Sequence, residues 1–150
     1  MIDLMITPST LQKYALFGGL IDDQIENLVP LMVKEEFGSD VTIIEEGKTN
    51  DKIYFITEGQ VSISRKGTNL AKLNEGDAFG EMEVLDVMPA VATIKTLTPV
   101  IAMSISNKAL RKVYNIDIKA FSLIIMNLAR DLSRRLRKMD EVIASSSILI

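Results

Sequence analysis

Cysteine, histidine and tryptophan are all absent from the 150 residues of this chain. Without cysteine the chain forms no disulfide and offers no thiolate. Without histidine it lacks the commonest metal ligand and the commonest general base near neutral pH. The sequence therefore predicts no metal site and no catalytic residue, and most hydrolytic and metal-dependent mechanisms lose their usual side chains.

Long hydrophobic runs are also absent, although 47% of the residues are apolar. No run approaches the roughly 20 residues that cross a bilayer, and the N-terminal MIDLMITPST has no basic region followed by an apolar stretch. We therefore expect a cytoplasmic protein without a membrane partner. The length favours a single domain over residues 1–150 with one substantial core.

The net charge of -3 is unevenly distributed along the chain. Residues 1–107 carry 8 basic and 16 acidic side chains, whereas residues 108–150 carry 9 and 4. A basic C-terminal part is typical of a helix with a solvated basic face, and it is also compatible with binding to nucleic acid.

Glycines divide the middle of the chain into short segments rich in Val, Ile, Phe and Thr. Two short helices are expected before them, in LQKYALF after Thr7–Ser9 and in DQIENLV after a capping box of Asp23 and Glu26. The segments VTIIEEG, KIYFITEG, QVSISRKG, NLAKLNEG and TIKTLTPVIAMSIS then each fit strands followed by turns. The pattern predicts a mainly β fold with flanking α, an antiparallel jelly-roll β-barrel over about residues 33–107.

Residues 108–143 contain no glycine or proline and are expected to form the C-terminal helical part, including one long amphipathic helix. Its apolar stripe consists of Phe121, Ile125, Leu128, Leu132, Leu136, Met139 and Ile143. The first two are expected to pack on the chain's own barrel. The stripe beyond the barrel predicts a homodimer through Leu128, Leu132, Leu136 and Met139. Arg135 interrupts a strict heptad, which favours a short or splayed pairing.

Six short motifs occur in a specific order: LFGGL at 16–20, EEG at 45–47, YFITEGQV at 54–61, LNEGD at 73–77, FGE at 79–81 and PAVAT at 89–93. Together they resemble the cyclic nucleotide-binding domains of the catabolite activator protein and of kinase regulatory subunits. The resemblance covers about residues 12–140. It implies a jelly roll with helices at both ends, which agrees with the fold expected from the glycine spacing.

The resemblance also implies a ligand site in the segment from Phe79 to Thr93, called the cassette below. In that family the FGE turn leads into a short helix whose backbone N–H groups face the cyclic phosphate. Gly80 would permit the close approach, and Glu81 would accept a hydrogen bond from the ribose 2'-hydroxyl. The inherited pocket is therefore expected at Phe79, Gly80, Glu81, Met82, Ala90 and Val91. Without the resemblance, Gly80 is explained by a turn with positive φ and Glu81 by a helix start.

The cassette departs from the family pattern after Pro89, where ligand-binding members carry an arginine that pairs with the phosphate and this chain has Ala90. Val91 stands where a small hydroxyl residue is common. The charged residues between Leu73 and Ile94 are all acidic, which repels an anion. Lys95 is expected on the strand face opposite Ile94, so it does not replace the arginine. The pocket is then left for a neutral or cationic ligand, or for none.

These observations favour a non-catalytic regulatory or scaffolding module that binds cyclic nucleotides weakly or not at all and needs no cofactor. One alternative is a sensor of cyclic AMP or cyclic GMP that acts on a partner protein. Another is a nonspecific nucleic-acid binder through Arg130, Arg134, Arg135, Arg137 and Lys138, although no aromatic residues are interleaved for stacking. A helix-turn-helix is not expected, because only about ten residues follow Met139. A third alternative is an enzyme on a jelly-roll barrel, such as a cupin. Cupin-type sites resemble clusters of histidines around a metal, and this chain has no histidine.

Overall fold

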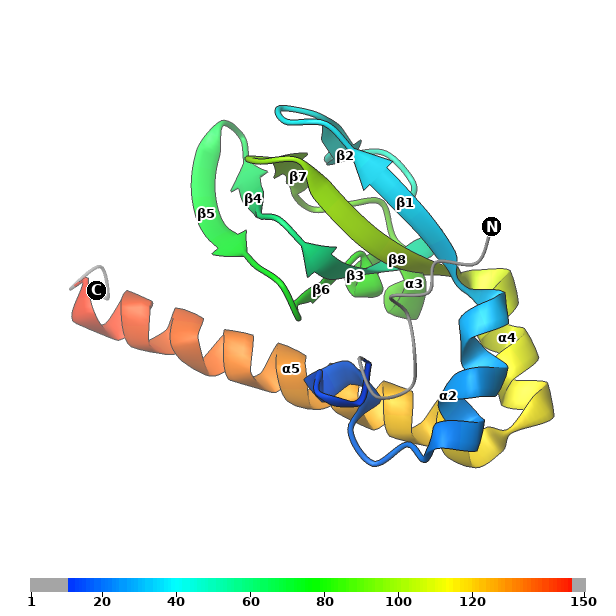
Figure 1. Ribbon diagram of the computed structural model, residues 1–150. Helices are drawn as coiled ribbons and strands as arrows, with labels where there is room; N and C mark the ends of the chain where they lie inside the picture. The colour runs from blue at the N-terminus through cyan, green and yellow to red at the C-terminus, as the bar shows by residue number, and fades with distance from the viewer. Residues whose placement is uncertain (1–10, 147–150) are drawn as a thin grey trace.

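The computed structural model describes residues 11–146, which form a small β-barrel with helices along one side (Figure 1). Residues 1–10 and 147–150 lie outside the described part, and so does the proposed cap at Thr7–Ser9. Among the described residues, no helix combines the length and the hydropathy that crossing a bilayer requires.

The barrel consists of two four-stranded antiparallel sheets, which confirms the expected fold class. The first sheet has the order β1-β8-β3-β6, with β1 at Val33–Phe37, β8 at Val100–Ser106, β3 at Lys52–Glu58 and β6 at Ala78–Phe79. The second has the order β2-β7-β4-β5, with β2 at Thr42–Ile44, β7 at Thr93–Thr96, β4 at Val61–Arg65 and β5 at Thr68–Leu73. The sequence segments chosen as strands correspond to β2, β3, β4, β5, β7 and β8.

Strand β3 of the first sheet is buried on both faces, and its sequence shows why. Tyr54 and Ile56 point into the barrel, whereas Ile53 and Phe55 point toward the helices and join a second apolar cluster there. Because side chains alternate along a strand, a run of apolar residues such as Ile53–Ile56 fits a strand covered on both sides. The helices therefore pack on the outer face of this sheet.

The N-terminal helical part is more broken than the sequence predicts. It contains the 3-10 turn η1 at Ala15–Phe17, the helix α2 at Asp22–Leu28 and the 3-10 turn η2 at Val29–Leu31. The capping box was placed wrongly at Asp23 and Glu26. Helix α2 starts one residue earlier, and the Gln24 side chain accepts the Ile21 N–H at 3.0 Å.

The C-terminal part is two helices, α4 at Asn107–Ile116 and α5 at Ile118–Ser145. Asp117 separates them with an extended backbone, and its carboxylate accepts the Ala120 N–H at 3.1 Å as the N-cap of α5. Helix α5 runs beneath the barrel and extends past it (Figure 1). Phe121 and Ile125, expected to pack on the barrel, pack against the apolar cluster that the helices form with the outer face of the first sheet, and the Phe121 ring contacts Tyr114 of α4.

One residue of the predicted dimer stripe was assigned wrongly. Leu128 is only 1% exposed and belongs to the chain's own core, because at this point α5 still lies under the first sheet. Leu132 is half-buried, and Leu136 and Met139 are exposed beyond the barrel. The stripe that is free for a partner therefore begins one turn later than the sequence suggests.

Asn127 fastens α5 to the N-terminal segment. Its buried amide donates to the Leu16 carbonyl at 2.9 Å and to the Gly18 carbonyl at 3.0 Å. Asn127→Ala removes both donors and leaves two partly buried acceptors without them, so we expect the free energy of unfolding to fall by about 2 kcal/mol. Urea denaturation measures this loss. Met126→Ala, at the half-exposed neighbouring position, is the control, and equal losses for both variants would contradict the assigned role of Asn127.

Candidate functional site

The cassette starts with a turn that only glycine fits. Strand β6 brings Phe79 into the barrel, where its ring stacks on the ring of Tyr54 with 4.9 Å between the ring centroids. Gly80 follows with a φ of 86°, in the left-handed region. A Cβ there would lie 2.4 Å from the Lys52 carbonyl oxygen and 2.9 Å from Asn50 Nδ2. Gly80 is thus required both for its positive φ and for the close approach of the backbone.

Asn50 holds this turn in place and was missed by sequence reasoning. Its amide donates to the Lys52 carbonyl at 2.8 Å and to the Gly80 carbonyl at 3.2 Å, and its Oδ1 accepts the Lys52 N–H at 3.2 Å. Asparagine is common in turns, where its side chain usually hydrogen-bonds to the nearby backbone. The sequence therefore gave no sign that this one reaches the cassette, 30 residues away.

Glu81 opens the helix α3 at Glu81–Asp86 and is buried, with 3% of its surface exposed. The Arg135 guanidinium on α5 donates to its carboxylate at 3.0 Å, and also donates to the Ala78 carbonyl. The same guanidinium contacts the Asp131 carboxylate at 2.8 Å. A cation thus reaches the cassette from the C-terminal helix, which sequence reasoning did not foresee.

Burial raises the pKa of Glu81 above its usual range, and the attraction of Arg135 only partly opposes this. Burial also raises the pKa of Glu83, although a hydrogen bond from Asn50 lowers it in part. Tyr54 at the base of the site has its pKa raised to about 12, first by burial and then by Glu35 and Asp51. The surroundings of the cassette therefore disfavour added negative charge.

Ala90 lies at the far end of the cassette, 5% exposed and in contact with the barrel core. Its N–H donates to the Lys48 carbonyl and its carbonyl accepts the Gly47 N–H, both at 2.8 Å. These two bonds join the cassette to the EEG turn. The position expected to carry an arginine is therefore an apolar, backbone-fixed point on the barrel wall.

The predicted site residues divide between the barrel interior, the C-terminal helix and the surface. Phe79 and Ala90 share the apolar cluster inside the barrel, and Gly80 lies beside it, whereas the Glu81 carboxylate is directed to Arg135 of α5. Met82 and Val91 are more than two-fifths exposed. Lys95 points away from the barrel interior and pairs with Asp40 at 3.0 Å, as its strand position predicts. The structure thus places three of the six residues, Phe79, Gly80 and Ala90, at the barrel interior and directs Glu81 to the C-terminal helix.

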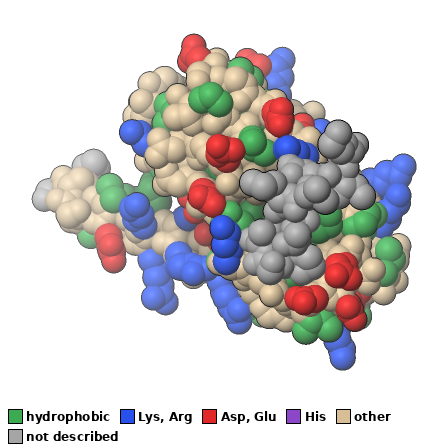
Figure 2. All heavy atoms as spheres, viewed as in Figure 1, with side chains coloured by type: hydrophobic (Ala, Val, Ile, Leu, Met, Phe, Trp, Pro, Cys, Tyr) green, Lys and Arg blue, Asp and Glu red, His purple; other side chains and the backbone are tan. Residues whose placement is uncertain are grey.

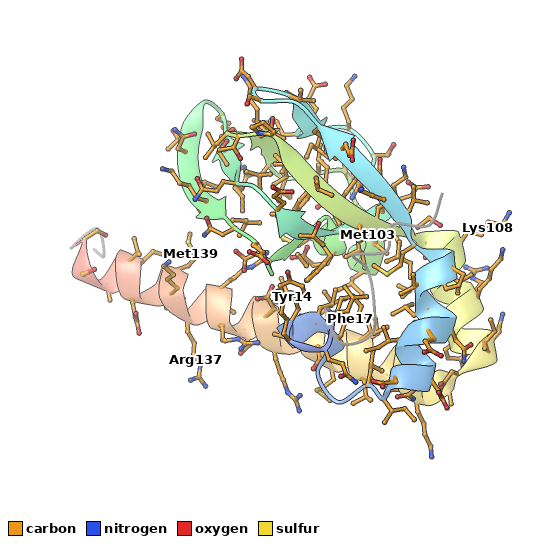
Figure 3. All side chains as sticks on the ribbon, in the orientation of Figure 1. Tyr14, Phe17, Met103, Lys108, Arg137 and Met139 are labelled. Carbon is orange, nitrogen blue, oxygen red and sulfur yellow. The ribbon has the colours of Figure 1, made fainter. Side chains whose placement is uncertain are left out.

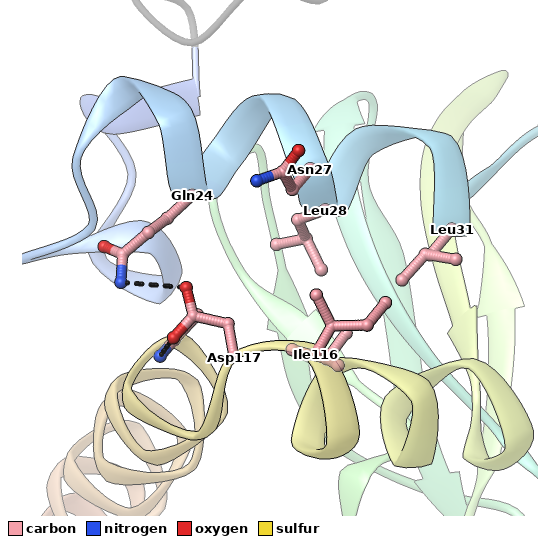
Figure 4. Close-up of a pocket in the computed structure, with 8 residues that line it drawn as sticks. Gln24, Asn27, Leu28, Leu31, Ile116 and Asp117 are labelled. Atoms are coloured by element: carbon pink, nitrogen blue, oxygen red, sulfur yellow. Dashed lines mark hydrogen bonds between the residues drawn. The ribbon is translucent and has the colours of Figure 1, made fainter.

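A small hollow lies elsewhere, between α2 and the junction of α4 and α5 (Figure 4). Apolar side chains such as Leu28, Leu31 and Ile116 line it together with the polar residues Gln24, Asn27 and Asp117. The Gln24 amide donates to the Asp117 carboxylate at 3.3 Å, so two of these three polar groups are already hydrogen-bonded to each other.

The basic residues of α5 fall on different faces. Figure 2 shows lysine and arginine side chains gathered along this helix, and Arg137 points away from the barrel in Figure 3. Arg135 is directed instead to Glu81. It is therefore removed from the set that was considered for nucleic-acid binding.

A family model described as "Cyclic nucleotide-binding domain" matches residues 34–117. The chain is also 30% identical over 139 residues to a CRP-like cAMP-activated global transcriptional regulator of Mycobacterium tuberculosis. That match includes 89% of this chain and 60% of the regulator, so the chain spans less than two thirds of its relative.

Solved structures have the same fold. A cyclic nucleotide-binding domain from Methylobacillus flagellatus superposes with a TM-score of 0.84 at 23% identity, over 93% of this chain and 81% of that one. The regulatory subunit of a cAMP-independent protein kinase A from Trypanosoma cruzi, bound to guanosine, superposes with a TM-score of 0.63 at 31% identity. It covers 69% of this chain and 38% of the subunit.

The raised pKa of Glu81 predicts a specific dependence of stability on pH. A group whose pKa is raised by folding stabilises the fold fully below its unfolded value, and this contribution is lost as the pH rises through the folded pKa. We therefore expect the unfolding free energy of the wild type, relative to Glu81→Gln, to decrease as the pH rises above 4.5, the ordinary pKa of the carboxyl. Urea denaturation across this range measures the difference. An increase with pH would mean that Arg135 outweighs burial.

Proposed function

This chain belongs to the cyclic nucleotide-binding domain family, and we propose that it is a non-catalytic regulatory or scaffolding module that binds cyclic nucleotides weakly or not at all. One observation carries the proposal: Ala90 occupies the expected arginine position as a buried, apolar point. In a ligand-binding relative an arginine there would pair with the phosphate. Truncating one partner of a buried charge pair costs about 2–5 kcal/mol, or roughly thirtyfold to several thousandfold in affinity.

The cation that does reach the cassette does not replace that arginine in this proposal. Arg135 already contacts the carboxylates of Glu81 and Asp131. A phosphate would have to compete with two carboxylates for one guanidinium, in a region whose other charged groups include Glu83 and Asp86. The charge balance thus favours an uncharged ligand over an anionic one.

An uncharged nucleoside is the ligand class that fits this balance. A nucleoside keeps the ribose hydroxyls, which can donate hydrogen bonds to Glu81. It lacks the phosphate, which the acidic cassette repels. The Trypanosoma cruzi relative, described as cAMP-independent and bound to guanosine, supports this choice. Calorimetric titration with cyclic AMP, cyclic GMP and guanosine distinguishes the alternatives. Binding of a cyclic nucleotide at micromolar concentration would favour the alternative of a cyclic nucleotide sensor.

The proposed module is a homodimer through the exposed end of α5. Leu136 and Met139 are 64% and 43% exposed, and Val142 and Ile143 next to them are also exposed. An apolar helix end of this kind is stabilised when a second copy covers it.

Restoring the missing cation should restore phosphate binding. We expect Ala90→Arg with Val91→Ser to raise the affinity for cyclic AMP at least tenfold, about 1.4 kcal/mol, because a charge-assisted pair and a hydroxyl donor are regained. Calorimetry measures the gain. Because Ala90 contacts the barrel core, a thermal unfolding curve must first show that the double variant folds. A folded variant that binds no better than wild type would mean that the cassette is remodelled beyond its charge.

The dimer is tested by charging its stripe. Leu136→Asp should convert the protein to a monomer at high micromolar concentration, because it places a carboxylate in an apolar contact. Sedimentation equilibrium measures the mass. Arg137→Asp is a strict control, since it changes the charge more but lies about 100° around the helix on the side facing away from the barrel. A monomeric wild type, or equal effects of both variants, would refute this interface.

A further inference from the structure

Three isoleucines lie exposed at the corner of the molecule where α2 begins and α4 meets α5. The Ile21 N–H donates to the Gln24 side chain at 3.0 Å, and the Gln24 amide in turn donates to the Asp117 carboxylate at 3.3 Å. Ile116 and Ile118 precede and follow Asp117 in the chain. These bonds gather Ile21, Ile116 and Ile118, which are 61%, 66% and 52% exposed and are called the isoleucine corner below. Exposed apolar residues are common singly, but several together mark a contact surface.

Two strips of opposite charge adjoin the isoleucine corner. The acidic strip lies on α2 and consists of Asp22, Asp23 and Glu26, and the basic strip lies on α4 and consists of Lys108, Arg111 and Lys112, all of them exposed. Figure 2 shows acidic side chains at the lower right, where Figure 1 places α2, and basic side chains at the right-hand margin, where it places α4. None of the six forms an ion pair with another residue of the described range 11–146. Neither strip is therefore neutralised within this part of the chain.

Both strips face the solvent because the opposite faces of their helices are buried. Ile25 and Leu28 of α2 and Leu110 and Val113 of α4 belong to the apolar cluster on the outer face of the first sheet. The charged residues occupy other positions of the helical repeat, so they point away from this cluster. The two helices lie side by side, since both line the hollow of Figure 4. The acidic strip, the isoleucine corner and the basic strip thus belong to one surface patch at this end of the molecule.

The mixed charge of this patch decides which kind of partner it fits. A nucleic acid or an anionic membrane would be attracted by the basic strip and repelled by the acidic strip beside it. A surface that carries one strip of each sign is instead complementary to itself. A two-fold axis brings the acidic strip of one copy opposite the basic strip of the other, and the reverse contact follows by symmetry. The two isoleucine corners then form the apolar centre of the contact.

We propose that a second copy of the chain docks on this patch through a two-fold contact that is separate from α5. The acidic strip of each copy faces the basic strip of the other, and the isoleucine corners pack together. The contact is small, and small interfaces are weak, so we expect it at protein concentrations of about 1 mM, above those at which the α5 contact forms. Dimers joined through α5 carry two such patches and associate further at this concentration. This contact lies outside the proposed function and does not depend on it.

Reversing the charge of one strip at a time tests the contact. The acid-reversed variant carries Asp23→Lys and Glu26→Lys, the base-reversed variant carries Arg111→Glu and Lys112→Glu, and both also carry Leu136→Asp to remove the α5 contact. Amide chemical shifts of isotope-labelled protein at low salt measure the association. With Leu136→Asp alone, residues 21–26 and 108–118 should shift as the concentration rises to about 2 mM.

Each reversed variant should associate at least tenfold more weakly than Leu136→Asp alone, because its two strips carry the same sign and repel those of its copy. A mixture of the two reversed variants should restore the affinity to within about threefold, since every strip again faces one of opposite charge. The dispersed spectrum of each variant shows that it is folded.

The matched control is Arg134→Glu with Arg137→Glu, which makes the same change of charge on exposed positions of α5 outside the patch. Mixed with the acid-reversed variant, it should not restore association. A control mixture that binds as well as the matched mixture would overturn the proposal, because net charge alone would then explain the attraction. Leu136→Asp protein whose shifts do not change with concentration, or change only outside the patch, would also overturn it. A wild type without the α5 dimer contradicts only the proposed α5 contact, and the mixtures still decide this one.

Discussion

An ion pair between the partly buried Arg135 and the buried Glu81 connects the last helix of the chain to the turn that opens the cassette. Each partner is positioned by a separate constraint. Gly80, pressed against the Lys52 carbonyl, fixes where α3 begins, and Asn127 fixes where α5 passes beneath the barrel. Such a pair stabilises the fold little or even destabilises it, because removing the charges from water offsets their mutual attraction. Its main effect is therefore to define one relative placement of helix and barrel.

The jelly roll could be predicted from sequence because its signals are local. A glycine follows each of the strands β1 to β6, and the apolar run of Ile53–Ile56 fits a strand buried on both faces. Two features were beyond such reasoning. The break at Asp117 depends on a side chain that competes with a continuous helix. Helix α2 starts at Asp22, directly after Ile21, because the side chain of Gln24, a residue not considered as a cap, accepts the Ile21 N–H.

The site was predictable only in part, and Arg135 shows why. It lies 54 residues from Glu81, and no local pattern connects the two. An arginine interrupting an apolar helical stripe was visible in the sequence, and the structure explains it as a side chain that points to a buried carboxylate. Asn50 shows the same limit, since a polar residue in a turn carries no mark of its distant partner. Motif resemblance found Gly80, Glu81 and Ala90 because their spacing along the chain is short.

The two fastening points of α5 give this helix the mechanics of a lever. Asn127 and Arg135 are eight residues apart, about 12 Å along the axis, and the helix continues for ten residues, about 15 Å, past the second point. With Asn127 as the pivot, a displacement at Arg135 is enlarged slightly more than twofold at Ser145. A shift of about 1 Å at the cassette would move the helix tip by about 2 Å, roughly the scale on which packed helices exchange one arrangement for another.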